Sequence, residues 1–166
     1  GVSTPYISSS ILTIIREKEM VKKVDEDRLP DHIGWRLWQA NRNWLSAFVG
    51  GMRDAGHDWF SEARAGLMGN IPRSGVRQSV LIERVGTTKQ AVQQLLDGLE
   101  SEGIVERIVD PVDARGKYVR YTEKGLRALR DGDRVKQEIE ARYVEILGED
   151  RFAALTDALQ ALEAQR

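Results

Sequence analysis

The chain has 166 residues, which suits one ordinary domain with added helices and is long enough to bury a core. Its apolar fraction of 41% and charged fraction of 31% are typical of a soluble, helix-rich protein, and no apolar run is long enough to span a bilayer, so we expect a cytoplasmic protein. The lack of cysteine excludes disulfides and thiolate metal sites, and His32 and His57 lie far apart in the sequence, so no cofactor and no metal site are predicted.

The net charge of -1 is unevenly distributed along the chain. Residues 70–130 hold 11 Lys and Arg against 8 Asp and Glu, and the flanking parts are acidic. A mildly basic middle is compatible with nucleic-acid binding, but many neutral surfaces match so small an asymmetry. Charge alone therefore does not decide the function.

Residues 1–30 predict an N-terminal arm or short helix that ends before Pro30. Four isoleucines recur there at helical spacing: Ile7, Ile11, Ile14 and Ile15. Asp31 is then a suitable N-cap for a long helix over residues 31–55, closed by Gly56. Its apolar residues spread over about half of the circumference, more than a helix on one surface needs, so we expect it to be covered on two sides.

The middle of the chain predicts a helix-turn-helix over about residues 78–101. A short helix near 59–68 and a Gly/Pro/Ser loop precede it. Gly86 ends its first helix, and Thr87 or Thr88 caps the second. One face of the second helix is apolar, with Val92, Leu95, Leu96 and Leu99 at helical spacing. The opposite face carries polar residues, Gln90, Gln94, Asp97 and Ser101, with Lys89 and Gln93 alongside. A glutamine amide can read adenine in the major groove, but a glutamine-rich face is also typical of a solvated one.

A β-hairpin is predicted directly after this pair of helices, over about residues 104–122. "GIVERIV" and "KYVRYT" are strand-like, residues 111–116 form the turn, and Thr122 caps the next helix. Arg115 at the tip suits the negative potential of a narrow minor groove. Asp110 and Asp113 allow a catalytic or metal-binding interpretation, but without a histidine or third acid nearby the structural one is favoured: Asp110 caps the turn and Asp113 orients Arg115.

These elements also carry a resemblance to a known family. "LIERVGTTKQAVQQLLDGLESEGIVER" followed by "DPVDARGKYVRYTEKG" resembles the core of the MarR family of bacterial transcriptional regulators, with its D-x-x-D-x-R wing ending in T-x-x-G. The resemblance implies a homodimeric winged-helix regulator, often responsive to a small aromatic or acidic ligand. It assigns the wing-tip pair to Asp113 and Arg115, and the groove-facing start of the recognition helix to Thr88, Lys89, Gln90, Gln93 and Gln94. Ala114 and Gln94 depart from the family, since arginine is common at both places.

The predicted fold class is mainly α with a small β-hairpin wing: a winged helix-turn-helix plus N- and C-terminal dimerisation helices. The MarR-like domain covers residues 31–166, with dimerisation helices at about 31–55 and 122–165; the later helices carry spaced apolar residues such as Leu155 and Leu159. They can fold back on their own domain or pair with a second chain, and a two-fold symmetric dimer suits palindromic DNA.

The predicted function is sequence-specific binding of double-stranded DNA by a homodimeric, ligand-responsive repressor. Its predicted contacts are Thr88, Lys89, Gln90, Gln93, Gln94, Arg115 and Lys117. The alternative is a winged-helix module that binds another protein; no triad, metal cluster or phosphate-binding loop predicts an enzyme.

A ligand pocket for an aromatic or acidic effector is predicted around Arg42, which shares a helical sector with Trp35 and Trp38, together with Trp59. The alternative is that the tryptophans are core residues and that Arg42 pairs with an acid of the same fold.

Overall fold

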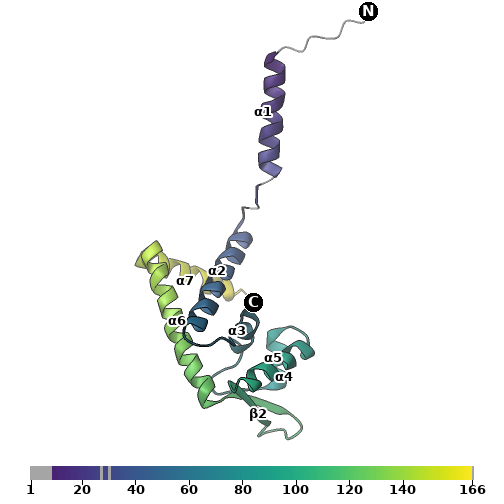
Figure 1. Ribbon diagram of the computed structural model, residues 1–166, viewed down its shortest axis with the longest axis vertical. Helices are drawn as coiled ribbons and strands as arrows, with labels where there is room; N and C mark the ends of the chain where they lie inside the picture. The colour runs from purple at the N-terminus through teal and green to yellow at the C-terminus, as the bar shows by residue number, and fades with distance from the viewer. Residues whose placement is uncertain (1–8, 27, 30, 166) are drawn as a thin grey trace, which may run out of the picture. The chain divides into compact units, whose positions relative to one another are not determined.

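The computed structural model describes residues 9–26, 28–29 and 31–165 (Figure 1). The chain divides into two compact units between Ala40 and Asn41, and each unit is described by itself. Ile7, which was predicted to share a helical face with later isoleucines, lies outside the described residues.

The first unit contains α1 (Ser9–Glu26) and the beginning of α2 (Ile33–Asp54). The predicted N-cap of α2 is wrong. The backbone N–H of Trp35 donates to Nδ1 of His32 at 3.2 Å, whereas Asp31 forms an ion pair with Arg36 at 2.6 Å. His32 directly precedes the helix, so its ring reaches the first turn, while Asp31 lies one residue too early to do so.

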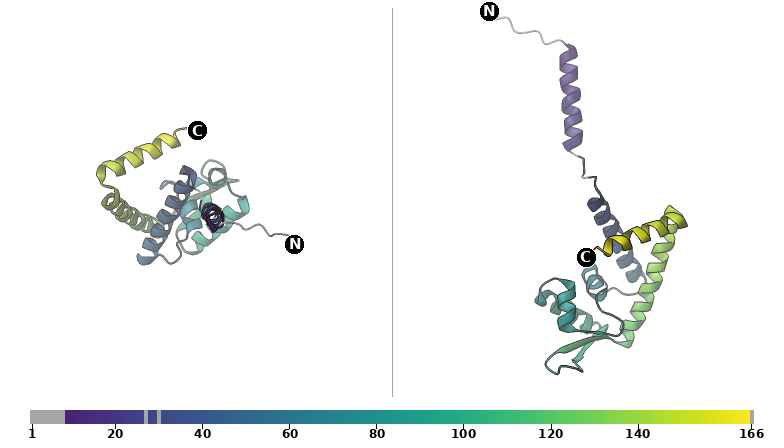
Figure 2. Two further views of the ribbon diagram at one scale, coloured as in Figure 1. Left: turned by 90° about the horizontal axis from the view of Figure 1, so that it is seen from above. Right: turned by 180° about the vertical axis from the view of Figure 1, so that it is seen from behind.

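The second unit holds the remaining elements in an order that matches the predicted fold class. After α2 come α3 (Glu62–Met68), β1 (Val76–Arg77), α4 (Gln78–Val85) and α5 (Lys89–Ser101), then β2 (Val105–Val109), β3 (Lys117–Tyr121), α6 (Glu123–Leu147) and α7 (Glu149–Glu163). Within this unit, α4, α5 and the β2–β3 hairpin lie together at one end of α6, and α7 follows at its other end (Figures 1 and 2). The short helix that was predicted near residues 59–68 starts later, because Ser61 accepts a hydrogen bond from the N–H of Arg64 and caps α3.

A three-stranded antiparallel sheet replaces the simple hairpin that the sequence predicted. Its strand order is β1-β3-β2, and Val76 and Arg77 of β1 pair with Val119 and Tyr118 of β3. A two-residue strand has too few residues for an alternating pattern, so the sequence does not reveal it. As a result, the segment that enters α4 is hydrogen-bonded to the wing.

The core lies under the two helices of the helix-turn-helix motif. Val92, Leu96 and Leu99 of α5 are fully buried, and Leu95 is partly buried beside them, which confirms the predicted apolar face. Gly86 ends α4 in the left-handed conformation with φ 68°, and Thr88 caps α5 by accepting from the N–H of Ala91 at 3.1 Å. These two caps fix the tight turn between the helices.

The end of the wing is anchored to α6. Thr122 accepts from the N–H of Gly125 at 3.0 Å and so caps α6 as predicted, while its backbone N–H donates to the carbonyl of Ile104. The hydroxyl of Tyr121 donates to the carbonyls of Met68, the last residue of α3, and of Ile71, and burial raises the pKa of this phenol. In the part of the chain that the structure describes, none of the helices is both long and apolar enough to cross a membrane.

Candidate nucleic-acid interface

The exposed face of α5 carries the side chains that the sequence singled out for base contact. Lys89, Gln90 and Gln94 are exposed near its N-terminal end, and Thr88 precedes them as the helix cap. Gln93 is only partly exposed, because it lies nearer to the buried face. Gln90 and Gln94 are four residues apart and therefore project from the same side of the helix.

The wing tip presents an arginine whose guanidinium is held by a neighbouring carboxylate. The side chain of Arg115 is 92% exposed, and its Nε donates to Oδ1 of Asp113 at 3.0 Å while a terminal nitrogen donates to Oδ2 at 3.1 Å. The guanidinium lowers the pKa of the Asp113 carboxyl through these hydrogen bonds. Asp113 thus contacts the guanidinium at two points, the geometry expected of a residue that orients Arg115.

Asp110 is the one acidic side chain that is buried among the described residues, with 4% of its side chain exposed. Its Oδ1 accepts from the backbone N–H of Val112 at 2.8 Å, within the turn of the wing. Its Oδ2 lies 2.9 Å from Nε of Arg77, at the entrance to α4. Both carboxylate oxygens therefore serve the structure: one shapes the wing turn and the other ties the wing to the helix-turn-helix.

A cavity of about 290 Å³, called the wing notch below, lies between the wing and the beginnings of α4 and α5. It brings together three of the predicted contacts, Lys89, Arg115 and Lys117, and both predicted wing supports. It also contains Arg77, Gln78, Ser79 and Ile82, which the sequence did not single out. Because these residues come from segments far apart in the sequence, only the fold shows that they share a site.

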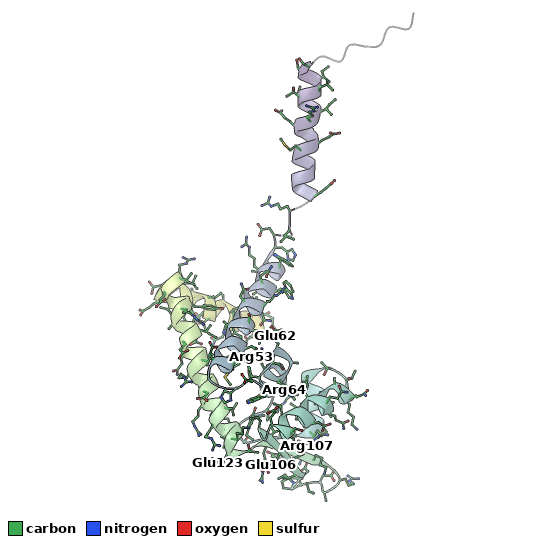
Figure 3. All side chains as sticks on the ribbon, viewed as in Figure 1. Arg53, Glu62, Arg64, Glu106, Arg107 and Glu123 are labelled. Carbon is green, nitrogen blue, oxygen red and sulfur yellow. The ribbon has the colours of Figure 1, made fainter. Side chains whose placement is uncertain are left out.

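Arg107 on β2 is a further residue that the sequence did not single out (Figure 3). Its Nε lies 2.8 Å from Oε2 of Glu100, and a terminal nitrogen lies 2.5 Å from Oδ1 of Asp97. The hydrogen bond with Glu100 is the largest of the effects that raise the pKa of Arg107. Arg107 therefore ties the first wing strand to α5 and neutralises two carboxylates in the C-terminal half of the recognition helix. Two carboxylates three residues apart on α5, Asp97 and Glu100, could have suggested a shared cationic partner but not its identity.

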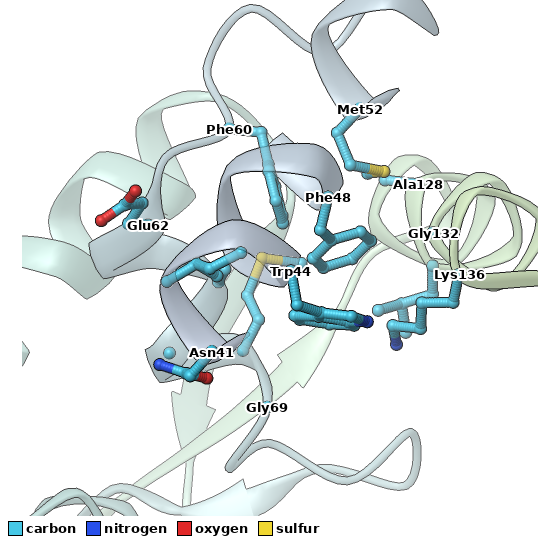
Figure 4. Close-up of a pocket in the computed structure, with 15 residues that line it drawn as sticks. Asn41, Trp44, Phe48, Met52, Phe60, Glu62, Gly69, Ala128, Gly132 and Lys136 are labelled. Atoms are coloured by element: carbon cyan, nitrogen blue, oxygen red, sulfur yellow. The ribbon is translucent and has the colours of Figure 1, made fainter. Parts of the chain in front are cut away.

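An apolar cavity in the second unit is lined by residues other than those predicted for the ligand pocket. It measures about 420 Å³ and lies between α2, α3 and α6, with Trp44, Phe48 and Phe60 as its aromatic lining and Lys136 at its side (Figure 4). Trp35, Trp38, Arg42 and Trp59, which the sequence predicted as a ligand pocket, do not line it.

The three predicted tryptophans pack against other aromatic rings. Trp35 stacks on Trp38 with ring centroids 5.1 Å apart, and Trp59 packs edge-on against Phe60 at 5.5 Å. Arg42 is exposed on α2. Helical angle placed Arg42 near two indoles, but it does not indicate which other helix faces them, and this depends on long-range packing.

A helix-turn-helix whose second helix is followed by a projecting, anchored hairpin defines a winged helix-turn-helix protein. Residues 62–116, which hold the helix-turn-helix together with the first strand and tip of the wing, match the model of the MarR family. This match agrees with the resemblance seen in the sequence.

The chain is also similar in sequence to a curated transcriptional regulator. The transcriptional regulator HosA of Escherichia coli O111:H- is 34% identical over 74 residues, and the alignment covers 42% of this chain and 55% of that relative. The chain thus matches about half the length of this curated relative.

Two solved structures show the same fold over most of the chain. A MarR-family transcriptional regulator from Rhodococcus sp. RHA1 is 25% identical with a TM-score of 0.65, covering 82% of this chain and 95% of that one. A variant of MarR from Escherichia coli complexed with operator DNA is 21% identical with a TM-score of 0.65, covering 78% and 92%. HosA and the Rhodococcus protein are both described as transcriptional regulators.

Proposed function

We propose that the protein is a transcriptional regulator that binds double-stranded DNA, with α5 in the major groove and the β2–β3 wing in the neighbouring minor groove. The observation that carries the proposal is the wing notch, where a recognition-helix cation, Lys89, and the wing cations Arg115 and Lys117 line one surface. The DNA-bound structure of the similar MarR variant supports it. Thr88, Gln90, Gln93 and Gln94 are proposed contacts on α5, with Gln93 the least accessible.

Substitutions on the helix and on the wing separate base reading from electrostatic attraction. Gln94→Ala is expected to lose about 1 to 3 kcal/mol at the preferred DNA sequence and to relax the choice of base there. Arg115→Ala is expected to weaken binding to many sequences and to make the salt dependence shallower, because a charged contact near phosphates is lost. Fluorescence anisotropy with matched and single-base-changed DNA, measured over a range of salt concentrations, checks both.

Gln137→Ala is a suitable control, because this exposed glutamine lies on α6 outside the proposed interface. It should leave affinity and base preference unchanged, and circular dichroism should show all three variants folded. If Arg115→Ala keeps full affinity and Gln94→Ala weakens every sequence equally, the surface is not a DNA reader. A protein-binding winged helix would then be the better account.

We propose further that the chain acts as a homodimer on pseudo-palindromic DNA. The C-terminal helices support this, because their apolar side chains are left uncovered by the described residues: Ile146 is 76% exposed, and Leu155, Leu159 and Leu162 are 43%, 38% and 60% exposed. Uncovered leucines on a folded helix indicate a contact surface. A second copy supplies the same surface with two-fold symmetry, which a palindromic site requires.

We propose further that the protein is a ligand-responsive repressor and that its effector binds in the cavity between α2, α3 and α6. Its aromatic lining suits a planar ring, and Nζ of Lys136 lies 5.2 Å from the centre of the Phe48 ring, so that a cation stands beside the aromatic surface (Figure 4). This combination favours a small aromatic acid. Such a ligand would bind between α3, which precedes the helix-turn-helix, and the proposed dimerisation helices α2 and α6, and so alter DNA occupancy.

Titration with salicylate-like acids is expected to change tryptophan fluorescence in a saturable way, because Trp44 lines the cavity. Trp44→Phe should remove most of the change, and Lys136→Gln should weaken binding about tenfold through loss of a charge-assisted contact. Arg127→Gln, on the exposed side of α6, is the matched control and should bind as the wild type does. The absence of a saturable response across a varied panel of aromatic acids would count against an effector of this class.

A further inference from the structure

The wing notch has an excess of positive charge that the contacts within the chain do not use up. Four cationic side chains line it, Arg77, Lys89, Arg115 and Lys117, against two carboxylates, Asp110 and Asp113. Asp113 is engaged by Arg115, and Asp110 by the wing turn and Arg77. The notch therefore retains a net positive charge and suits an anion.

Arg77 is both fixed in place and accessible. It belongs to β1, where it pairs with Tyr118 of β3, and Nε lies 2.9 Å from Oδ2 of the buried Asp110. Even so, 43% of its side chain remains exposed. A guanidinium has five N–H donors in a planar fork, and one carboxylate oxygen engages only part of them. Arg77 is therefore oriented by Asp110 and still has donors for a ligand in the notch.

The proposed DNA complex places a strand at this point. A major groove and the minor groove next to it are separated by one sugar–phosphate backbone. A protein that inserts α5 into the former and its wing tip into the latter must straddle that backbone. The wing notch lies between these two parts of the protein, because its lining comes from the beginning of α5, the beginning of α4 and the wing.

We propose that the wing notch holds one backbone phosphate of the strand between the two grooves, with Arg77, Lys89 and Lys117 as its ligands and Asp110 as the positioning residue of Arg77. This inference rests on the proposed DNA-binding function and adds a contact that the sequence did not predict. A contact of this kind fixes the position of the protein on the duplex and carries no base preference.

The inference predicts the behaviour of Arg77→Gln. Affinity should fall about tenfold for preferred and non-preferred DNA alike, because a charged hydrogen-bonded contact to phosphate is lost. The slope of log affinity against log salt should become shallower by about 1, since one fewer phosphate is neutralised. Arg73→Gln is the matched control: Arg73 is also an exposed, ion-paired arginine, with Asp133 of α6 as partner, and it does not line the notch. It should bind with wild-type affinity and slope.

A second set of variants separates a phosphate ligand from a residue that merely supports the wing. If Arg77 only compensates Asp110, its loss should have no effect once Asp110 is replaced by asparagine. The phosphate role predicts that the double variant Arg77→Gln/Asp110→Asn still binds about tenfold more weakly than Asp110→Asn alone. Disappearance of that difference would overturn the phosphate role and leave Arg77 as a wing support.

The phosphate itself can be located with DNA in which single phosphates are replaced by neutral methylphosphonates. One replacement, on the strand between the two grooves, should weaken the wild type about tenfold and should weaken Arg77→Gln clearly less, because only Lys89 and Lys117 still contact that phosphate in the variant. Equal effects on both proteins at every phosphate would refute the inference while leaving the DNA-binding function intact. If the wild type shows no salt-dependent binding to any DNA, the proposed function itself fails, and the inference fails with it.

Discussion

Gly125→Ala is expected to destabilise the second unit by about 3 kcal/mol or more, because an added Cβ would overlap the backbone carbonyl of Ile104. A backbone atom cannot rotate away as a flexible side chain can, so α6 and the start of the wing would have to separate. That contact holds the base of the hairpin against α6, where Thr122 also bonds to the backbone of Ile104. Thermal unfolding followed by circular dichroism should show a lower midpoint, and DNA affinity should fall with the folded population.

Gly50→Ala provides the matched control. Gly50 lies inside α2, and a Cβ there would meet no atom within 4 Å. Alanine should therefore be neutral or stabilise the helix by up to about 1 kcal/mol, in line with its higher helix propensity. Equal melting temperatures for the two variants would show that the close approach of Gly125 to Ile104 is not required.

Removal of α7 by ending the chain after Gly148 is expected to abolish the folded dimer and to give aggregated or unfolded protein. When the interface supplies much of the buried apolar surface, the subunits are stably folded only in the dimer. Multi-angle light scattering together with circular dichroism measures both mass and folding. A folded, monodisperse monomer, from either the full-length or the shortened chain, would contradict the proposed interface.

A full-length pair of variants separates dimerisation from simple loss of chain. Leu159→Lys places a charge within the exposed apolar row of α7, whereas Gln160→Lys adds the same charge at an exposed polar residue beside it. The first should shift the dimer toward monomer or aggregate, because burying an unpaired ammonium is costly. The second should remain dimeric.

Much of the fold could be predicted because its signals are local. Gly86, Thr88 and Thr122 act as caps within a few residues of their partners, and each is found in the predicted role. The apolar face of α5 repeats at helical spacing, so its burial follows from periodicity. The wing turn was also predictable, since Asp110 and Asp113 act on neighbours two or three residues away.

The remainder depends on contacts between segments that are distant in the sequence. Nothing local indicates that Arg77 meets Asp110, or that the two-residue strand β1 joins the wing. The cavity beside Lys136 depends in the same way on how α6 packs against α2, whereas the helical angle of Arg42 describes one helix alone. The N-cap of α2 was missed for a different reason. Asp31 and His32 are adjacent and either can cap a helix, so the choice between them depends on the residue at which the helix starts.

Selection of bound sequences from a pool of random duplex DNA tests the central claim most directly, when the affinity for the enriched sequence is then measured over a range of salt concentrations. The account predicts enrichment of one pseudo-palindromic sequence, with half-sites about one helical turn apart, and an affinity whose logarithm falls linearly with the logarithm of salt concentration. A pool that stays random through repeated rounds at low salt, with folded dimeric protein, would contradict the claim that this winged helix reads DNA.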